Sequence, residues 1–131
     1  MDSVVHFEMP YEKRDRMAKF YQSAFGWETR MLGPDMGNYV IAVTTASTDA
    51  GPTSPGAING GFYEKTSDKP MQYPSVVIAV DDITQSTRKV TAAGGQVLGD
   101  PWDIPGVGQY VSFIDSEGNR VSMLQPNPRG R

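Results

Sequence analysis

The sequence contains no cysteine. That absence excludes disulfide bonds, thiolate zinc sites and cysteine nucleophiles, and it is typical of a protein in the reducing cytoplasm. No apolar run approaches the roughly 20 residues of a membrane-spanning helix, and residues 1–3 lack the basic segment that opens a signal peptide. We therefore expect a cytoplasmic protein that has no membrane partner.

An excess of positive charge is absent too. The chain carries 12 basic and 15 acidic side chains, a formal net charge of −3, and its isoelectric point is about 5.0. Proteins that bind nucleic acids need clustered lysine and arginine side chains that displace counterions, whereas the basic residues here are scattered. The glycine-rich spacings of nucleotide-binding loops are also missing. We expect no nucleic-acid partner.

The length and composition of the chain indicate one folded domain. The chain has 131 residues, of which 38% are hydrophobic and 21% are charged. This length is enough to bury a core but too short for two independent domains of ordinary size. We therefore treat residues 1–131 as a single domain.

The first half of the chain begins with an alternating segment. Residues 4–9 predict a strand that carries His6 and Glu8 on one face and Phe7 and Met9 on the other. An apolar stripe with helical spacing follows, and Gly26 supplies its C-terminal stop. The stripe consists of Met17, Phe20, Tyr21, Ala24 and Phe25. Three further strands are predicted over residues 27–32, 38–45 and 56–64, with a polar loop at 46–55.

The second half repeats this order. Residues 75–80 predict a strand, and Asp82 is a suitable N-cap for a helix with Gln85 three residues later. Gly94 and Gly95 end that helix. Its expected buried face consists of Ile83, Thr87, Val90 and Gly94. The last strands are predicted over residues 96–98, 108–114 and 120–125.

The repeated order indicates an internal duplication of a βαβββ unit. Module one covers about residues 3–65 and module two about residues 74–126, joined by a linker at 66–74. The predicted fold class is therefore α+β, built from two βαβββ modules.

Short segments along residues 6–126 carry a resemblance to a known family. They are residues 6–10 (HFEMP), 20–21 (FY), 25–27 (FGW), 80–83 (VDDI), 92–95 (AAGG), 104–108 (IPGVG), 115–119 (DSEGN) and 125–126 (QP). In this order they resemble the vicinal oxygen chelate superfamily, which includes glyoxalase I, bleomycin-resistance proteins and extradiol dioxygenases. The resemblance implies that the modules form incomplete barrels around a cavity, with the helices outside, and that the protein is a homodimer.

The resemblance also raises the question of a metal. Enzymes of this family hold one ion with His, Glu or Gln side chains from the first and last strands of each module. His6 matches the first such position, but Ser75 and Ser122 stand where many of these enzymes carry His and Glu, and residues 59–61 offer Asn-Gly-Gly. A neutral serine hydroxyl is a poor ligand for a divalent ion. Although Glu8 and Gln125 remain as oxygen donors, we expect no tightly bound metal and no cofactor.

Three functions stay open. The first is a protein that binds a small organic molecule in the cavity without metal, as antibiotic-binding resistance proteins of the family do. The second is a lyase, isomerase or dioxygenase in which His6 and Glu8 are the catalytic residues, as a base or as part of an unusual metal site. The third is a subunit or regulatory module whose cavity is filled by side chains.

Candidate ligand-binding residues come from both modules. Aromatic side chains suit the walls of a small-molecule site, and Phe113 is a further candidate of this kind. The expected ligand contacts are Tyr39, Asn59, Tyr63, Ser75, Trp102, Tyr110 and Ser122.

Overall fold

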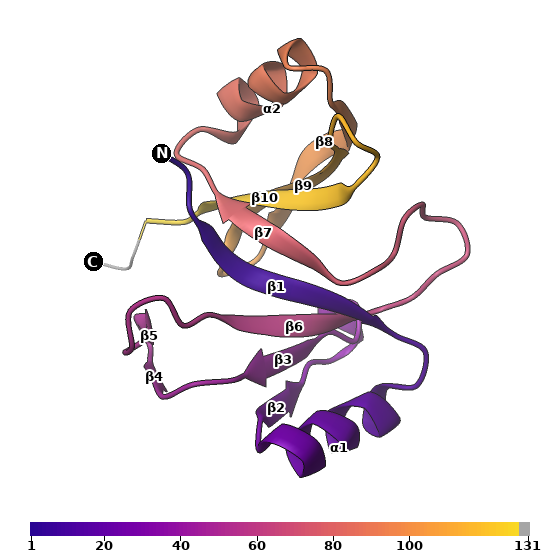
Figure 1. The fold of residues 1–131 in the computed structure, drawn as a ribbon, viewed down its shortest axis with the longest axis vertical. Coiled ribbons are helices and arrows are strands. Elements are labelled where there is room, and N and C mark those ends of the chain that lie inside the picture. The colour runs from indigo at the N-terminus through magenta and orange to yellow at the C-terminus, as the bar shows by residue number, and fades with distance from the viewer. Residues whose placement is uncertain (129–131) are drawn as a thin grey trace. The chain divides into compact units, whose positions relative to one another are not determined.

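A computed structural model describes residues 1–128, and the chain divides into two compact units. The N-terminal unit consists of residues 6–74, and the C-terminal unit combines residues 1–5 with the segment from Ser75 onward. Both have the order strand, helix and three strands (Figure 1). The α+β class and the repeated βαβββ unit are thus confirmed.

The N-terminal unit is a four-stranded sheet with one long helix. Strand β1 pairs in parallel with β6, which pairs antiparallel with β3, and β3 pairs antiparallel with β2. A small β4–β5 hairpin lies within the polar loop predicted at residues 46–55. The elements are β1 (Val4–Tyr11), α1 (Arg14–Phe25), β2 (Glu28–Met31), the 3-10 helix η1 (Pro34–Met36), β3 (Val40–Val43), β4 (Ser47–Thr48), β5 (Gly51–Pro52) and β6 (Asn59–Glu64).

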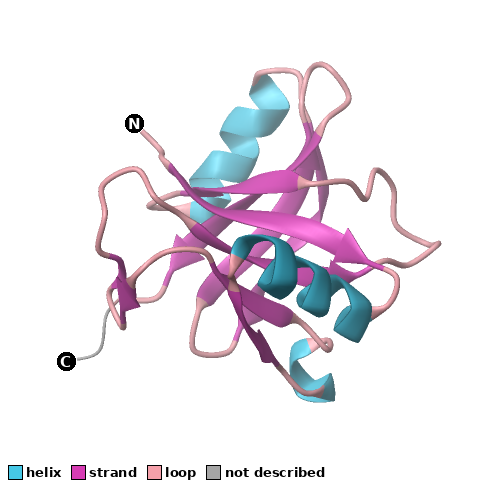
Figure 2. Ribbon diagram, turned by 60° about the horizontal axis from the view of Figure 1, so that its bottom comes forward, coloured by secondary structure: helices cyan, strands magenta, loops and turns pink. Residues whose placement is uncertain are grey.

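The C-terminal unit has the same strand order. Strand β7 pairs in parallel with β10, and the pairs β10–β9 and β9–β8 are antiparallel. Its elements are β7 (Ser75–Ala79), α2 (Ile83–Ala92), β8 (Gln96–Ile104), β9 (Gly108–Ile114) and β10 (Arg120–Pro126). In each unit the first strand therefore lies beside the last, and the helix packs on one face of the sheet (Figure 2).

The core of the N-terminal unit lies between α1 and its sheet. It is formed by Tyr11, Val40, Ala42 and Phe62, with Phe7, Met9, Met17, Tyr21 and Trp27 packed against them. Because Phe7 and Met9 face the helix, His6 and Glu8 project from the opposite face of β1. The alternation predicted for this strand is confirmed.

The buried side of α1 is narrower than expected. The helix ends at Gly26 in the left-handed conformation, as predicted, but Phe20 and Phe25 are 58% and 65% exposed. Their rings pack on Tyr21, with centroid distances of 5.0 and 6.0 Å. The helical spacing correctly predicted α1. The apolar stripe, however, included residues that do not enter the core.

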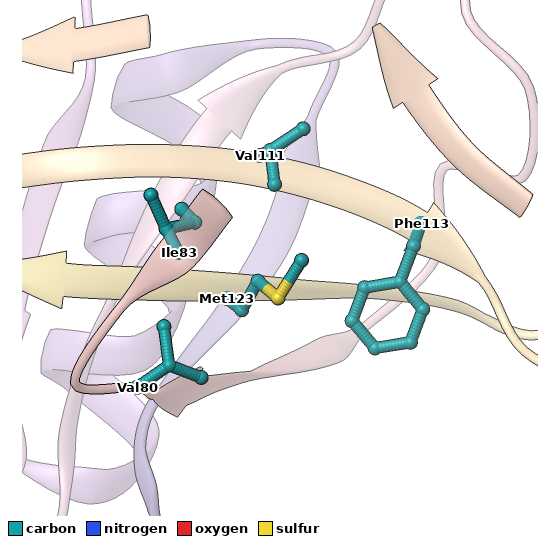
Figure 3. Close-up of a cluster of buried hydrophobic side chains, with 5 residues drawn as sticks. All are labelled: Val80, Ile83, Val111, Phe113 and Met123. Atoms are coloured by element: carbon teal, nitrogen blue, oxygen red, sulfur yellow. The ribbon is translucent and has the colours of Figure 1, made fainter. Parts of the chain in front are cut away.

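The core of the C-terminal unit lies between α2 and its sheet. Figure 3 shows its buried cluster, which consists of Val80, Ile83, Val111, Phe113 and Met123. Phe113 is therefore a core residue and not the wall of a cavity. The backbone N–H of Gln85 donates to Asp82 Oδ1 at 3.0 Å, which confirms the predicted N-cap.

Strand β8 is longer than its sequence pattern predicted. Its pairing with β9 shifts register between Leu98 and Trp102. This stretch contains Gly99, at φ +87°, and Pro101, residue types that weaken strand signals and mark bulges. Within residues 1–128, no helix combines the length and apolar character needed to cross a bilayer.

Candidate functional site

Three polar side chains meet on the face of the N-terminal sheet that points away from α1. His6 and Glu8 come from β1, and Tyr39 immediately precedes β3. The Tyr39 hydroxyl oxygen lies 3.0 Å from His6 Nε2 and donates to Glu8 Oε2 at 3.1 Å. His6 is partly buried and Glu8 is buried. We call these three residues the His6–Tyr39–Glu8 cluster.

A glycine pair in β6 makes the cluster sterically possible. Gly61 lies between Glu8 on β1 and Ile41 on β3 in the sheet register. A Cβ atom at position 61 would overlap the Tyr39 ring, so the missing side chain lets Tyr39 reach across β6 to β1. Gly60 performs the same role on the helix-facing side, where the Phe7 ring occupies the space.

The environment of His6 determines its charge. Burial disfavours the imidazolium form and lowers the pKa of His6 from 6.5 to about 4. The ring is therefore neutral at pH 7. The cluster presents a neutral imidazole, a phenol and a carboxyl group, and it provides no cation.

Two other predicted ligand contacts lie in the same unit. The Asn59 Oδ1 atom accepts from the backbone N–H of Thr44 at 2.9 Å, and its Nδ2 atom donates to Ser47 Oγ at 2.8 Å. Asn59 therefore holds the entry to the β4–β5 hairpin, and the structure does not bring it into the cluster. Tyr63 is partly buried and stands two residues after Gly61 on β6, so its side chain projects from the same sheet face as the cluster.

A series of hydroxyl groups occupies the sheet face of the C-terminal unit away from α2. Ser122 Oγ lies 2.7 Å from Tyr110 Oη and 2.8 Å from Ser112 Oγ. The Trp102 ring, on β8, meets the Tyr110 ring at a centroid distance of 5.5 Å and is 55% exposed. Ser75, at the start of β7, is partly buried and takes no part in these hydroxyl bonds.

Ser112 was missed in the sequence. The turn at residues 115–119 could have identified it. That turn pairs Ile114 with Arg120 and therefore places Ser112 opposite Ser122. The resemblance directed attention to Ser122, while its hydrogen-bond partner on the adjacent strand required the register of the hairpin.

Gln125 has a structural partner. Its Oε1 atom accepts from the backbone N–H of Ile83 at 2.9 Å, in the first turn of α2. Helix N-termini leave such donors without partners inside the helix. The Gln125 oxygen therefore caps α2 and is not available as a donor to a metal.

The side chains of the two units do not fit a divalent ion of the kind the resemblance implies. Across residues 1–128, no three His, Cys, Asp or Glu side chains gather closely enough to hold one. His6 and Glu8 offer one imidazole and one carboxylate, and both are hydrogen-bonded to Tyr39. Ser122, on the last strand of the second unit, brings a hydroxyl that is already bonded to two others.

The fold agrees with a comparison of the chain with known families. The model of the glyoxalase/bleomycin resistance protein/dioxygenase superfamily matches residues 3–123. The chain belongs to this superfamily.

Individual relatives differ in how much of their length is shared. CFP32 of Mycobacterium bovis is 39% identical over 70 residues, which are 53% of this chain and 27% of that protein. The chain thus spans about a quarter of its length. A glyoxylase-like domain-containing protein of Didymella fabae is 31% identical over 113 residues, 86% of this chain and 84% of that protein.

A solved structure supports the fold over nearly the whole chain. Methylmalonyl-CoA epimerase from Mycobacterium tuberculosis has a TM-score of 0.67 at 12% identity. The superposition covers 96% of this chain and 89% of the epimerase chain. At this identity the likeness concerns the fold.

Proposed function

We propose that this protein binds a small organic molecule at the His6–Tyr39–Glu8 cluster without a tightly bound metal. The observation that carries the proposal is the position of the Tyr39 hydroxyl between His6 and Glu8. Tyr39 hydrogen-bonds to His6 and Glu8, the two side chains that could otherwise bind a metal, and holds them in a preorganised polar arrangement. Preorganised polar groups suit the recognition of a small ligand.

The charge of the cluster limits the ligand. The pKa of His6 is about 4 because of burial, so its ring is uncharged at neutral pH, and Glu8 is a buried carboxyl group. His6 is neutral, and neither Tyr39 nor Glu8 can carry a positive charge, so the cluster itself offers an anionic group no counter-charge. We therefore expect the part of the ligand that contacts the cluster to be neutral and polar.

Trp102 supports an aromatic ligand. Its half-exposed ring packs against Tyr110, whose hydroxyl bonds to Ser122. A flat apolar ring next to hydroxyl groups suits an aromatic molecule that carries polar substituents. We propose Trp102, Tyr110 and Ser122 as ligand contacts within the C-terminal unit by itself.

A superfamily enzyme is the second candidate. The observation that favours it is the hydrogen-bonded series of imidazole, phenol and carboxylate, since a neutral imidazole supported by a carboxylate is a general-base arrangement. The reaction would be that of a lyase, isomerase or dioxygenase. His6 would take the proton, and Glu8 would accept the hydrogen that Tyr39 donates.

A thermal-shift screen tests the binding proposal. Neutral aromatic alcohols, ketones and amides are screened against the wild type, with and without added Zn²⁺, Ni²⁺ and Mn²⁺. We expect compounds that raise Tm equally with and without metal, and we expect His6→Ala and Glu8→Gln to lose the shift. Glu12→Gln is the matched control, because Glu12 is an exposed carboxylate just beyond β1.

Two outcomes contradict the proposal. Stoichiometric metal that stays with the protein through gel filtration without chelator overturns the metal-free site. Tm shifts that persist in His6→Ala place the ligand elsewhere. For the second candidate, a panel of isomerase, lyase and ring-cleavage assays should detect turnover that His6→Ala abolishes at nearly unchanged Tm, and equal activity in that variant dismisses the enzyme.

A further inference from the structure

The hydroxyl group of Tyr39 is shared between two neighbours. It lies within hydrogen-bond distance of both His6 Nε2 and Glu8 Oε2. A phenol has one hydrogen to donate, and the Tyr39 hydroxyl is the donor in its bond to Glu8 Oε2. The Tyr39 hydrogen therefore goes to Glu8, and the Tyr39 oxygen is left to accept a hydrogen from His6.

This arrangement determines where the hydrogen of the imidazole lies. A neutral histidine carries one hydrogen on its two ring nitrogens, and burial keeps His6 neutral at pH 7 by lowering its pKa. Since Nε2 donates to Tyr39, Nδ1 carries a lone pair. The Nε2 atom is the ring nitrogen that lies 3.0 Å from the Tyr39 oxygen.

We propose that Tyr39 is a positioning residue that fixes His6 in the Nε2–H tautomer, so that Nδ1 is left as an acceptor and selects a ligand that donates a hydrogen bond. Hydroxyl and amide N–H groups have the required chemistry. The tautomer follows from the two hydrogen bonds of Tyr39 and the neutral state of His6. The preference for a donor rests on the proposed function, because it requires that the ligand occupies this cluster.

The same arrangement gives the catalytic alternative a balanced proton route. The bond between the substrate and its acidic hydrogen breaks, its electron pair stays on the substrate, and the proton binds to His6 Nδ1. The Nε2 hydrogen then passes to the Tyr39 oxygen, and the original Tyr39 hydrogen passes to Glu8. The substrate gains one negative charge, Glu8 loses one, and no buried imidazolium remains.

Nitrogen NMR of the histidine ring tests the tautomer directly. His6 is the only histidine in the sequence, so protein labelled with ¹⁵N-histidine gives one pair of ring signals. At pH 7 without ligand, we expect Nε2 to give the signal of a protonated nitrogen and Nδ1 that of an unprotonated one. A protonated Nδ1, or an averaged mixture of tautomers, overturns the proposal.

The variant Tyr39→Phe tests whether Tyr39 fixes the tautomer of His6. We expect Tyr39→Phe to shift the His6 ring signals toward mixed tautomers, because the acceptor for Nε2–H is gone. Tyr21→Phe is the matched control, since that hydroxyl bonds to Met9 Sδ in the core between α1 and the sheet, and it should leave the ring signals unchanged. Unchanged signals in Tyr39→Phe contradict the role of Tyr39, and the wild-type spectrum decides the tautomer even if this variant does not fold.

A pair of probes tests the ligand preference. Phenol offers a hydroxyl donor, and anisole has the same ring without that hydrogen. We expect millimolar phenol to move the Nδ1 signal and anisole to leave it in place, whereas equal shifts, or none with phenol, overturn the donor preference. Because the tautomer is measured on the free protein, that result is independent of whether any ligand is found.

Discussion

His6 shows how the surroundings of one side chain set its chemistry. Its ring lies on the polar face of β1 and bonds to Tyr39. A free histidine would be partly protonated near pH 6.5, whereas burial lowers the pKa of His6 to about 4. The protonation state of this residue is thus coupled to folding.

The coupling predicts a pH dependence of stability. As the pH falls from 6.5 to 4, the unfolded chain takes up a proton on His6 and the folded chain does not, so the free energy of unfolding decreases. The total loss is about 3 kcal/mol, at about 1.4 kcal/mol per pH unit. Urea unfolding at pH 7, 5.5 and 4.5 measures it.

The comparison variant is His6→Gln, which has no group that titrates in this range. It should lose less stability than the wild type between pH 6.5 and 4, while carboxyl groups affect both proteins alike. Parallel curves for the two proteins would show that burial does not alter the protonation of His6.

At the scale of residues, the sequence predicted part of the site. Alternation along β1 put His6 and Glu8 on one face, and the structure agrees. It did not show that Tyr39 bonds to both, because this contact depends on the pairing of β3 with β6 and of β6 with β1, and on the space above Gly61. The sequence pattern of a single strand cannot predict a contact that depends on the pairing of three strands.

Strand β6 controls both faces of the N-terminal sheet through two adjacent glycines. Gly60 leaves room for the Phe7 ring on the helix side, and Gly61 leaves room for Tyr39 on the polar side. A substitution at position 60 should therefore affect mainly the stability of the core, and one at position 61 mainly the geometry of the His6–Tyr39–Glu8 cluster.

Alanine substitutions exploit this separation. Gly60→Ala should lower the free energy of unfolding by about 1–3 kcal/mol, because it overpacks the core at Phe7. Gly61→Ala should lower the free energy of unfolding less, since the partly exposed Tyr39 can turn toward solvent. In this variant the His6 ring should no longer give the single-tautomer signals of the wild type. Urea unfolding and ¹⁵N-histidine spectra of both variants test this, and a wild-type spectrum in Gly61→Ala would refute the steric role of Gly61.

At the scale of elements, the prediction was accurate where one periodicity dominated. The span of β9 agrees with its alternating pattern, and α1 ends at its glycine. It was wrong where local residue types concealed the pairing, as at Pro10 inside β1 and at Gly99 and Pro101 inside β8. Strand pairing with distant neighbours decided those boundaries.

The whole molecule is a repeat with divergent polar faces. Both units have the same strand order, yet one carries imidazole, phenol and carboxyl groups and the other carries hydroxyls. Hydrophobic patterning predicted the common framework. The divergence of the two faces was visible in part, at Ser75 and Ser122, through the resemblance.

We also propose that the protein is a homodimer, as the family resemblance implies. The exposed rings of Phe20 and Phe25 on α1 support association, since large exposed aromatic side chains favour burial by a partner. Sedimentation velocity at micromolar concentration should give a species of twice 14.3 kDa. A single species of 14.3 kDa across that concentration range would rule the dimer out.

The bond between Gln125 and Ile83 constrains how β10 can diversify over evolution. Position 125 already serves the first turn of α2, so a lineage that recruited it for a new ligand would have to find another acceptor for that helix. Position 122 lies on the same strand and bonds only to neighbouring hydroxyls. New binding chemistry should therefore arise at 122 before it arises at 125.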